Sequence, residues 1–165
     1  MLATALSEEY EESGEAVTLG QRTSILDLYF GGDLTAAFAL GAEGVQMGTR
    51  MVSALESPVH DNWKNAIVAA AETDTLFLND RHSPALRALR TNRTEALVGA
   101  EHNVFGEFGN AQALYFGGDM EAAIALSGQV AGRIDSVRPV ADIIASTVSE
   151  FIATVDRLSS KGVPA

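Results

Sequence analysis

The sequence contains no cysteine, which excludes a disulfide framework and any metal site built on thiolates. No apolar run approaches the roughly 20 residues that span a bilayer, and the N-terminus does not have the pattern of a signal peptide. Basic residues are few, because 11 Lys and Arg stand against 22 Asp and Glu, for a formal net charge of −11. Such a chain repels nucleic acid and anionic membranes, so we expect neither as a partner and expect a cytoplasmic protein.

Common catalytic motifs are also missing. The sequence has no Gly-x-Ser-x-Gly elbow, no Gly-x-x-x-x-Gly-Lys loop and no Gly-x-Gly-x-x-Gly turn. Its three histidines, His60, His82 and His102, do not have the spacing of metal ligands, and each is interpreted as a surface or turn residue. The sequence therefore predicts no catalytic residue and no metal ligand.

The most informative segment is residues 41–55. A short apolar run at about 43–47 is typical of a buried strand, and it ends in Gly48-Thr49, where we expect a helix to begin. Backbone N–H groups at a helix start favour a phosphate group, and small residues let its oxygens approach the backbone. The alternative interpretation of Gly48 is a turn that only ends a strand.

Several further segments, taken in order, extend this local pattern. They are Gly41–Arg50 (GAEGVQMGTR), Trp63–Val68 (WKNAIV), Glu72–Thr75 (ETDT), Pro84–Arg90 (PALRALR) and Leu126–Ile134 (LSGQVAGRI). Together they resemble the C-terminal part of the nitronate monooxygenase family, to which flavin-dependent enoyl-acyl-carrier-protein reductases are closely related. The resemblance covers roughly residues 31–160.

The resemblance implies FMN, bound at the C-terminal mouth of a (β/α)8 barrel, and oxidation of alkyl nitronates with O2. It implies that Gly48 and Thr49 hold the FMN phosphate and that Gln46 faces the barrel interior. The family's catalytic histidine lies in an earlier Glu-Ala-Gly-Gly-His motif, which this sequence lacks.

Two further pairs are implied by the same resemblance. Gly128 and Gln129 match a Gly-Gln segment near the flavin, although Gln129 can also be interpreted as a solvated loop amide. Gly31 and Gly32 match the Gly-Gly of the family's phosphate site, but here Asp33 and a helix follow at once.

Because a complete barrel needs about 250 residues, we expect part of an α/β fold, a partial (β/α)8 barrel that is helix-rich with two or three short strands. The expected division is an acidic segment at 1–27, a C-terminal portion of the FMN-binding barrel at 28–160, and a tail at 161–165.

Local patterns predict the remaining elements. They are a helix at 34–40 capped by Asp33, a helix at 61–71 capped by Asp61, a strand at 75–78, a helix beginning at Ser83-Pro84 with Leu86, Leu89 and Leu97 facing inward, and an amphipathic helix beginning at Pro139.

A short internal repeat complicates the pattern. Residues 28–33 (LYFGGD) recur at 114–119, and both copies continue into Ala-Ala-x-Ala-Leu, at 36–40 and 122–126. We interpret both as joints in which glycine ends one helix and aspartate caps the next; the alternative is a rearrangement that replaced the usual strand.

Three functional hypotheses remain open. The first is a nitronate monooxygenase acting on a small carbanion and O2, and the second is an enoyl reductase that uses a nicotinamide cofactor. The third is a non-catalytic helical protein that forms a homo-oligomer, since open strand edges favour association.

Overall fold

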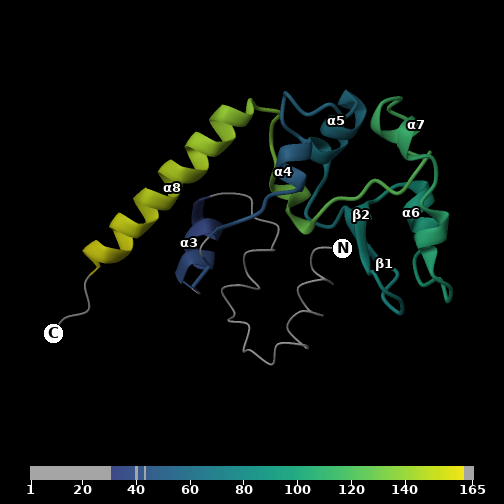
Figure 1. Cartoon of the computed structure of the whole chain (residues 1–165), viewed down its shortest axis with the longest axis horizontal. Coiled ribbons are helices and arrows are strands. Elements are labelled where there is room, and N and C mark those ends of the chain that lie inside the picture. Colours follow the sequence, from purple (N-terminus) through teal and green to yellow (C-terminus); the bar gives the residue numbers. More distant parts are fainter. Residues whose placement is uncertain (1–30, 40, 43, 162–165) are drawn as a thin grey trace. The chain divides into compact units, whose positions relative to one another are not determined.

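A computed structural model of the chain describes residues 31–39, 41–42 and 44–161. The chain divides into two compact units, one made of Met1–Met47 with Ala141–Ala165 (the first unit) and the other of Gly48–Val140 (the second unit). The described residues are helix-rich with two short strands, as the sequence predicts, and the two strands form one sheet (Figure 1). Among them, no helix is long and apolar enough to cross a membrane.

The elements follow one another in the chain in this order: α3 (Gly31–Ala39), α4 (Thr49–Val52), α5 (Asp61–Ala69), β1 (Thr75–Leu78), β2 (Leu86–Leu89), α6 (Asn92–Ala96), η1 (Val104–Glu107), α7 (Ala111–Tyr115), η2 (Gln129–Arg133) and α8 (Val140–Ser160).

Strands β1 and β2 form the centre of the second unit. They pair antiparallel, from Thr75 opposite Leu89 to Leu78 opposite Leu86. The strand at 75–78 is confirmed, but the helix expected after Ser83-Pro84 is wrong, because residues 86–89 form β2 instead. Backbone pairing with β1 outweighs the helical spacing of the leucines, although Leu86 and Leu89 are buried as predicted.

The free edge of β2 is covered by residues 125–127. Leu89 N–H donates to the Ala125 carbonyl (2.9 Å), and Ser127 N–H donates to the Arg87 carbonyl (3.0 Å). These bonds make residues 125–127 an irregular third segment beside the hairpin. They also carry the chain directly to Gly128.

An apolar core lies on this framework. Its buried residues come from both strands, the α6 end, η1 and the 122–127 segment: Leu78, Leu86, Ala88, Leu97, Val104 and Ile124. Buried Asn79 joins the hairpin turn to η1, because its Nδ2 donates to the Pro84 carbonyl (2.7 Å) and its Oδ1 accepts from Val104 N–H (3.0 Å). Every polar atom of that side chain's amide is thereby paired.

Helix α5 packs its apolar residues inward but begins differently from the prediction. The cap is His60, whose Nδ1 accepts from Asn62 N–H (3.1 Å), so Asp61 is the first helical residue instead of the cap. Asp61 forms an ion pair with Lys64 (3.4 Å). Trp63 is buried and meets the Tyr115 ring edge-on, with 4.7 Å between ring centroids.

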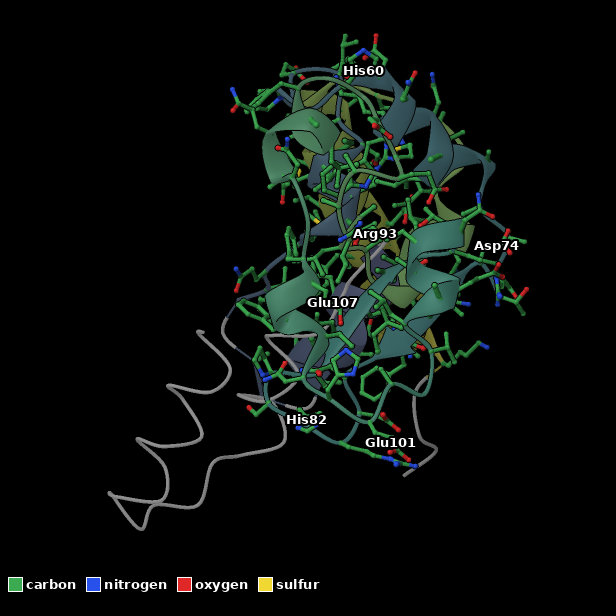
Figure 2. All side chains as sticks on the ribbon, turned by 90° about the vertical axis from the view of Figure 1, so that its right-hand side faces the viewer. His60, Asp74, His82, Arg93, Glu101 and Glu107 are labelled. Carbon is green, nitrogen blue, oxygen red and sulfur yellow. The ribbon has the colours of Figure 1, made fainter. Side chains whose placement is uncertain are left out.

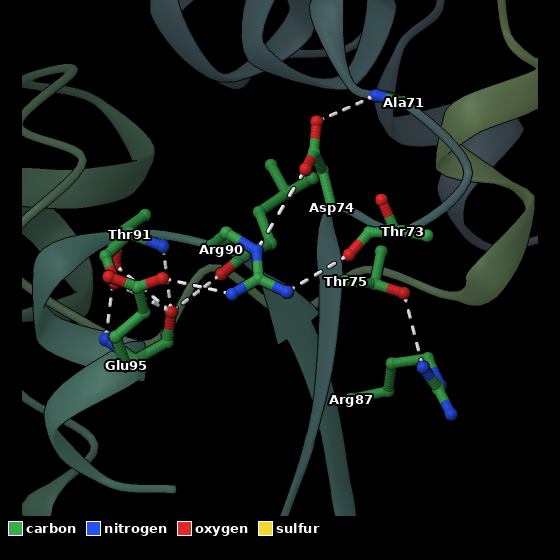
Figure 3. Close-up of polar contacts among 10 residues, drawn as sticks. Ala71, Thr73, Asp74, Thr75, Arg87, Arg90, Thr91 and Glu95 are labelled. Atoms are coloured by element: carbon green, nitrogen blue, oxygen red, sulfur yellow. Dashed lines mark hydrogen bonds and ion pairs between the residues drawn. The ribbon is translucent and has the colours of Figure 1, made fainter.

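Two arginines of the hairpin region are paired with neighbouring side chains. Arg90 contacts the Asp74 carboxylate (3.8 Å) and donates to Glu95 (2.9 Å), as Figure 3 shows. Arg87 donates to the Thr75 hydroxyl at 3.1 Å. These arginines therefore brace β1, β2 and α6 and do not form a single basic surface.

In the first unit, α3 begins at Gly31, so Asp33 lies inside the helix and is not its cap, contrary to the prediction. The strand expected at 43–47 is also wrong for the described residues 44–47, which form no strand. A barrel strand is held by neighbouring parallel strands, and β1 and β2, the strands of the described chain, pair with each other.

Helix α8 follows Pro139 as predicted. Phe151 contacts Phe38 of α3 (5.2 Å between ring centroids), and Ile143 is buried. Several other large apolar residues of this amphipathic helix are exposed, namely Ile144, Val148, Ile152, Val155 and Leu158.

The repeat does not form two equivalent joints. In the second copy, α7 ends ahead of Gly117-Gly118, as predicted, but Asp119 caps a turn and no helix follows. In the first copy, Gly31-Gly32 are the first residues of α3, and residues 28–30, where the prediction places the end of a preceding helix, lie outside the described part of the chain.

Candidate functional site

The helix expected at Gly48-Thr49 is present as α4. Its first intrahelical bonds run from Met51 N–H and Val52 N–H to the Gly48 carbonyl (2.9 and 3.0 Å). Gly48 is exposed, precedes the helix and supplies no side chain to cap it. The Thr49 backbone N–H lies ahead of these bonds, in the part of a helix where donors point outward.

The structure joins this helix start to a second one, 79 residues later. The Thr49 hydroxyl accepts a hydrogen bond from Gly128 N–H at 2.8 Å. Gly128 precedes η2 and, like Gly48, offers no side-chain cap. Two short helical turns that begin after glycine therefore meet at the contact between Thr49 and Gly128, which we call the Thr49–Gly128 junction.

A buried arginine next to the junction holds the following loop. Arg50 is 4% exposed, and its Nη1 donates to the Ser136 carbonyl (2.8 Å) and to the Ser53 hydroxyl (3.2 Å). Leu55 N–H also donates to the Arg138 carbonyl (2.9 Å). The chain beyond η2 is thus tied both to α4 and to the residues that follow it.

Ser127, which sequence reasoning did not single out, also lies beside the junction. It is 5% exposed, and its hydroxyl has no hydrogen-bond partner among the described residues. Its position directly before the predicted Gly128-Gln129 pair was the available signal. An unpaired buried hydroxyl is uncommon, because each one costs free energy.

The other predicted site residues are placed as follows. Gln129 is the first residue of η2 and is exposed. Gln46 is exposed in the first unit, and Gly31 and Gly32 form the first turn of α3 there. Of the predicted residues, the structure joins Thr49 and Gly128 by a direct contact.

The histidines have local structural roles, as the sequence interpretation expects. His60 caps α5, and the His82 ring lies 3.1 Å from the Glu101 carbonyl. His102 pairs with Glu107. Figure 2 shows His60 far from His82 and Glu101 within the second unit. In the part of the chain that the structure describes, no group of three or more His, Asp or Glu could hold a metal ion.

Comparisons with known proteins identify relatives. Residues 28–150 match the family model "Nitronate monooxygenase". A protein of Staphylococcus saprophyticus described as "Probable nitronate monooxygenase" is 47% identical over 49 residues, which are 30% of this chain and 14% of that protein.

Two solved structures are also similar to this chain. FabK from Thermotoga maritima is similar with a TM-score of 0.74 and 36% identity, over 82% of this chain and 45% of that one. A nitroalkane oxidase from Streptomyces ansochromogenes gives a TM-score of 0.59 at 21% identity, over 79% of this chain and 39% of that one, a likeness of fold alone. This chain therefore spans less than half the length of these relatives.

Proposed function

This chain belongs to the nitronate monooxygenase family, and we propose that it forms the FMN-phosphate site of a flavin-dependent oxidoreductase that oxidises alkyl nitronates with O2. The observation that carries the proposal is the Thr49–Gly128 junction. It brings together the two segments that the family resemblance assigns to the cofactor. Barrel enzymes commonly bind phosphate with such loops at helix starts.

The residues at the junction fit a phosphate group. Because the Thr49 oxygen accepts from Gly128, the hydroxyl hydrogen is not used in that bond and can be donated to a phosphate oxygen. Gly48 and Gly128 have no Cβ, so an oxygen can approach their backbone closely. Gln129 would be a further contact to the cofactor, and the family resemblance gives cofactor roles also to Gln46, Gly31 and Gly32, which belong to the first unit.

When bound, FMN supplies the redox chemistry, and the role proposed for this chain is to hold and orient it. We assign no catalytic residue within the 165 residues. The substrate class is a small nitronate or related carbanion, and the proposed location is the cytoplasm.

A second candidate is an FMN-dependent enoyl-acyl-carrier-protein reductase. The likeness to FabK, at 36% identity, favours it. Both classes need the same phosphate contacts, so the junction does not separate them. Oxidation of a nicotinamide cofactor by the FMN-loaded protein would support the reductase, and O2-dependent consumption of a nitronate would support the monooxygenase.

The first test is a fluorescence titration of the purified chain with FMN, comparing the natural protein with Thr49→Val. Valine keeps the branched shape but removes the hydroxyl, so we expect FMN to bind about tenfold more weakly or worse. The matched control is Thr75→Val in β1, whose hydroxyl accepts from Arg87; FMN affinity should not change. No saturable binding by the natural chain would contradict the proposal.

A further inference from the structure

Three buried side-chain polar atoms of the described residues have no hydrogen-bond partner, Trp63 Nε1, Arg93 Nε and Ser127 Oγ, and the last of them lies beside the Thr49–Gly128 junction. Ser127 is 5% exposed, and its Oγ has no hydrogen-bond partner in the described part of the chain. Ser53, also buried, shows the usual arrangement: its Oγ donates to the Arg50 carbonyl (2.9 Å) and accepts from the Arg50 guanidinium (3.2 Å). A buried hydroxyl without such partners destabilises the protein unless something outside the chain pairs with it.

The backbone on both sides of Ser127 is held in place. Its own N–H donates to the Arg87 carbonyl of β2 (3.0 Å), and the next N–H, that of Gly128, donates to the Thr49 hydroxyl (2.8 Å). The Ser127 backbone is therefore held beside the Thr49–Gly128 junction.

Packing alone does not account for a serine at this position. Ala123 and Ala125, in the same irregular segment as Ser127, are fully buried. Alanine would fill the same space without burying an unpaired oxygen. The choice of serine points to a ligand that accepts a hydrogen bond there.

We propose that the Ser127 hydroxyl donates a hydrogen bond to the phosphate of FMN, as a third contact beside Thr49 and Gly128. This inference rests on the proposed function, because it needs FMN to bind at the junction. We assign the hydrogen bond to the phosphate and not to another part of FMN, because Gly128, the residue after Ser127, contacts Thr49. Thr49 is the residue proposed to hold the phosphate. Hydrogen bonds to a charged acceptor are among the stronger ones.

The test compares Ser127→Ala with the natural chain in three measurements: the Kd for FMN, the Kd for riboflavin, which lacks the phosphate, and the Tm of the protein without flavin. We expect FMN to bind about tenfold or more weakly, riboflavin to bind as before, and the Tm to stay unchanged or rise. The rise would follow because an unpaired buried oxygen has been removed.

Ser53→Ala is the matched control. It removes a buried serine whose hydroxyl is paired, so it should lower the Tm. A Tm that falls in Ser127→Ala as it does in Ser53→Ala would show a structural hydroxyl and overturn the inference.

The remaining outcomes separate the inference from the proposed function. If the natural chain binds FMN and Ser127→Ala binds it equally well, the inference fails and the proposed function stands. Equal weakening for FMN and riboflavin overturns the assignment to the phosphate. If the natural chain binds no FMN, the proposed function fails and the inference with it.

Discussion

The two copies of Leu-Tyr-Phe-Gly-Gly-Asp, each followed by Ala-Ala-x-Ala-Leu, have almost the same sequence and different structures. In the first copy, residues 31–39 form one helix, α3, which includes both glycines and the aspartate. In the second copy, α7 ends before the glycines, and residues 122–126 form no helix and run alongside other segments. The first copy belongs to the first unit and the second copy to the second unit.

Backbone partners account for the difference. In the second copy, Asn110 N–H donates to the Ala122 carbonyl and Ile124 N–H donates to the Phe108 carbonyl, both at 2.8 Å. On the far side, Leu89 N–H donates to the Ala125 carbonyl. Alanine and leucine favour a helix only weakly, by less than about 1 kcal/mol per residue, so these pairings together with the complete burial of Ala123, Ile124 and Ala125 outweigh that preference.

Among the substitutions compared here, Gly109→Ala should destabilise the protein most, because it disturbs the backbone pairing of the second copy. Gly109 has φ +93°, and an added Cβ would lie 2.3 Å from the Ala122 carbonyl oxygen, which accepts the Asn110 bond. The backbone strain and the clash together should lower the free energy of unfolding by about 4 kcal/mol. Urea unfolding followed by Trp63 fluorescence measures it, since Trp63 is the sole tryptophan and is buried in the second unit.

Gly99→Ala is the control for backbone strain alone. Gly99 has a similar φ of +72°, but an added Cβ would meet nothing within 4 Å. It should cost about 1–2 kcal/mol. Equal losses for the two variants would contradict the role given to the backbone pairing of residues 108–110 with residues 122–124.

Replacing equivalent glycines of the two copies by alanine should change the free energy of unfolding in opposite directions. Gly118→Ala places a Cβ 2.2 Å from His60 Nδ1 at φ +71° and displaces the cap of α5, so we expect a loss of about 2–3 kcal/mol. Gly32→Ala lies within α3, where alanine is favoured by about 0.5–1 kcal/mol. Thermal unfolding followed by circular dichroism compares them, and a loss in both would mean that the copies are alike.

Substitution of Asp119 should have the smallest effect on stability. Asp119 Oδ1 accepts from Glu121 N–H (3.0 Å) in the turn after α7, so Asp119→Ala should cost about 1 kcal/mol of unfolding free energy, measured with urea. Asp119→Asn keeps the acceptor and should recover most of the loss. An unchanged stability in Asp119→Ala would remove the turn from the list of features that distinguish the second copy.

Patterns that depend on neighbours in the chain predicted the structure well. The strand at 75–78, the helix start at Thr49 and the start of α8 after Pro139 were all predicted from local signals. Errors arose where a distant segment decided the outcome, as for Leu86–Leu89, which pair with β1. The predicted helix caps were wrong by a residue or more; for α5, His60 supplies the capping acceptor instead of Asp61.

The candidate site follows the same division. The family motifs marked Thr49 and Gly128 separately, but no local pattern showed that a hydrogen bond joins them across 79 residues. Ser127 was not predicted because its significance is that its hydroxyl is buried and unpaired, and burial is a property of the folded chain.

By itself, the sequence determined the family, the helix-rich character and the segments that carry small residues at helix starts, because these follow from residue types and their spacing. The tertiary structure alone decided which segments pair, which hydroxyls are satisfied and which copy of the repeat becomes a helix. The physical reason is that local preferences are worth tenths of a kcal/mol per residue, whereas backbone pairing and burial against distant residues contribute more.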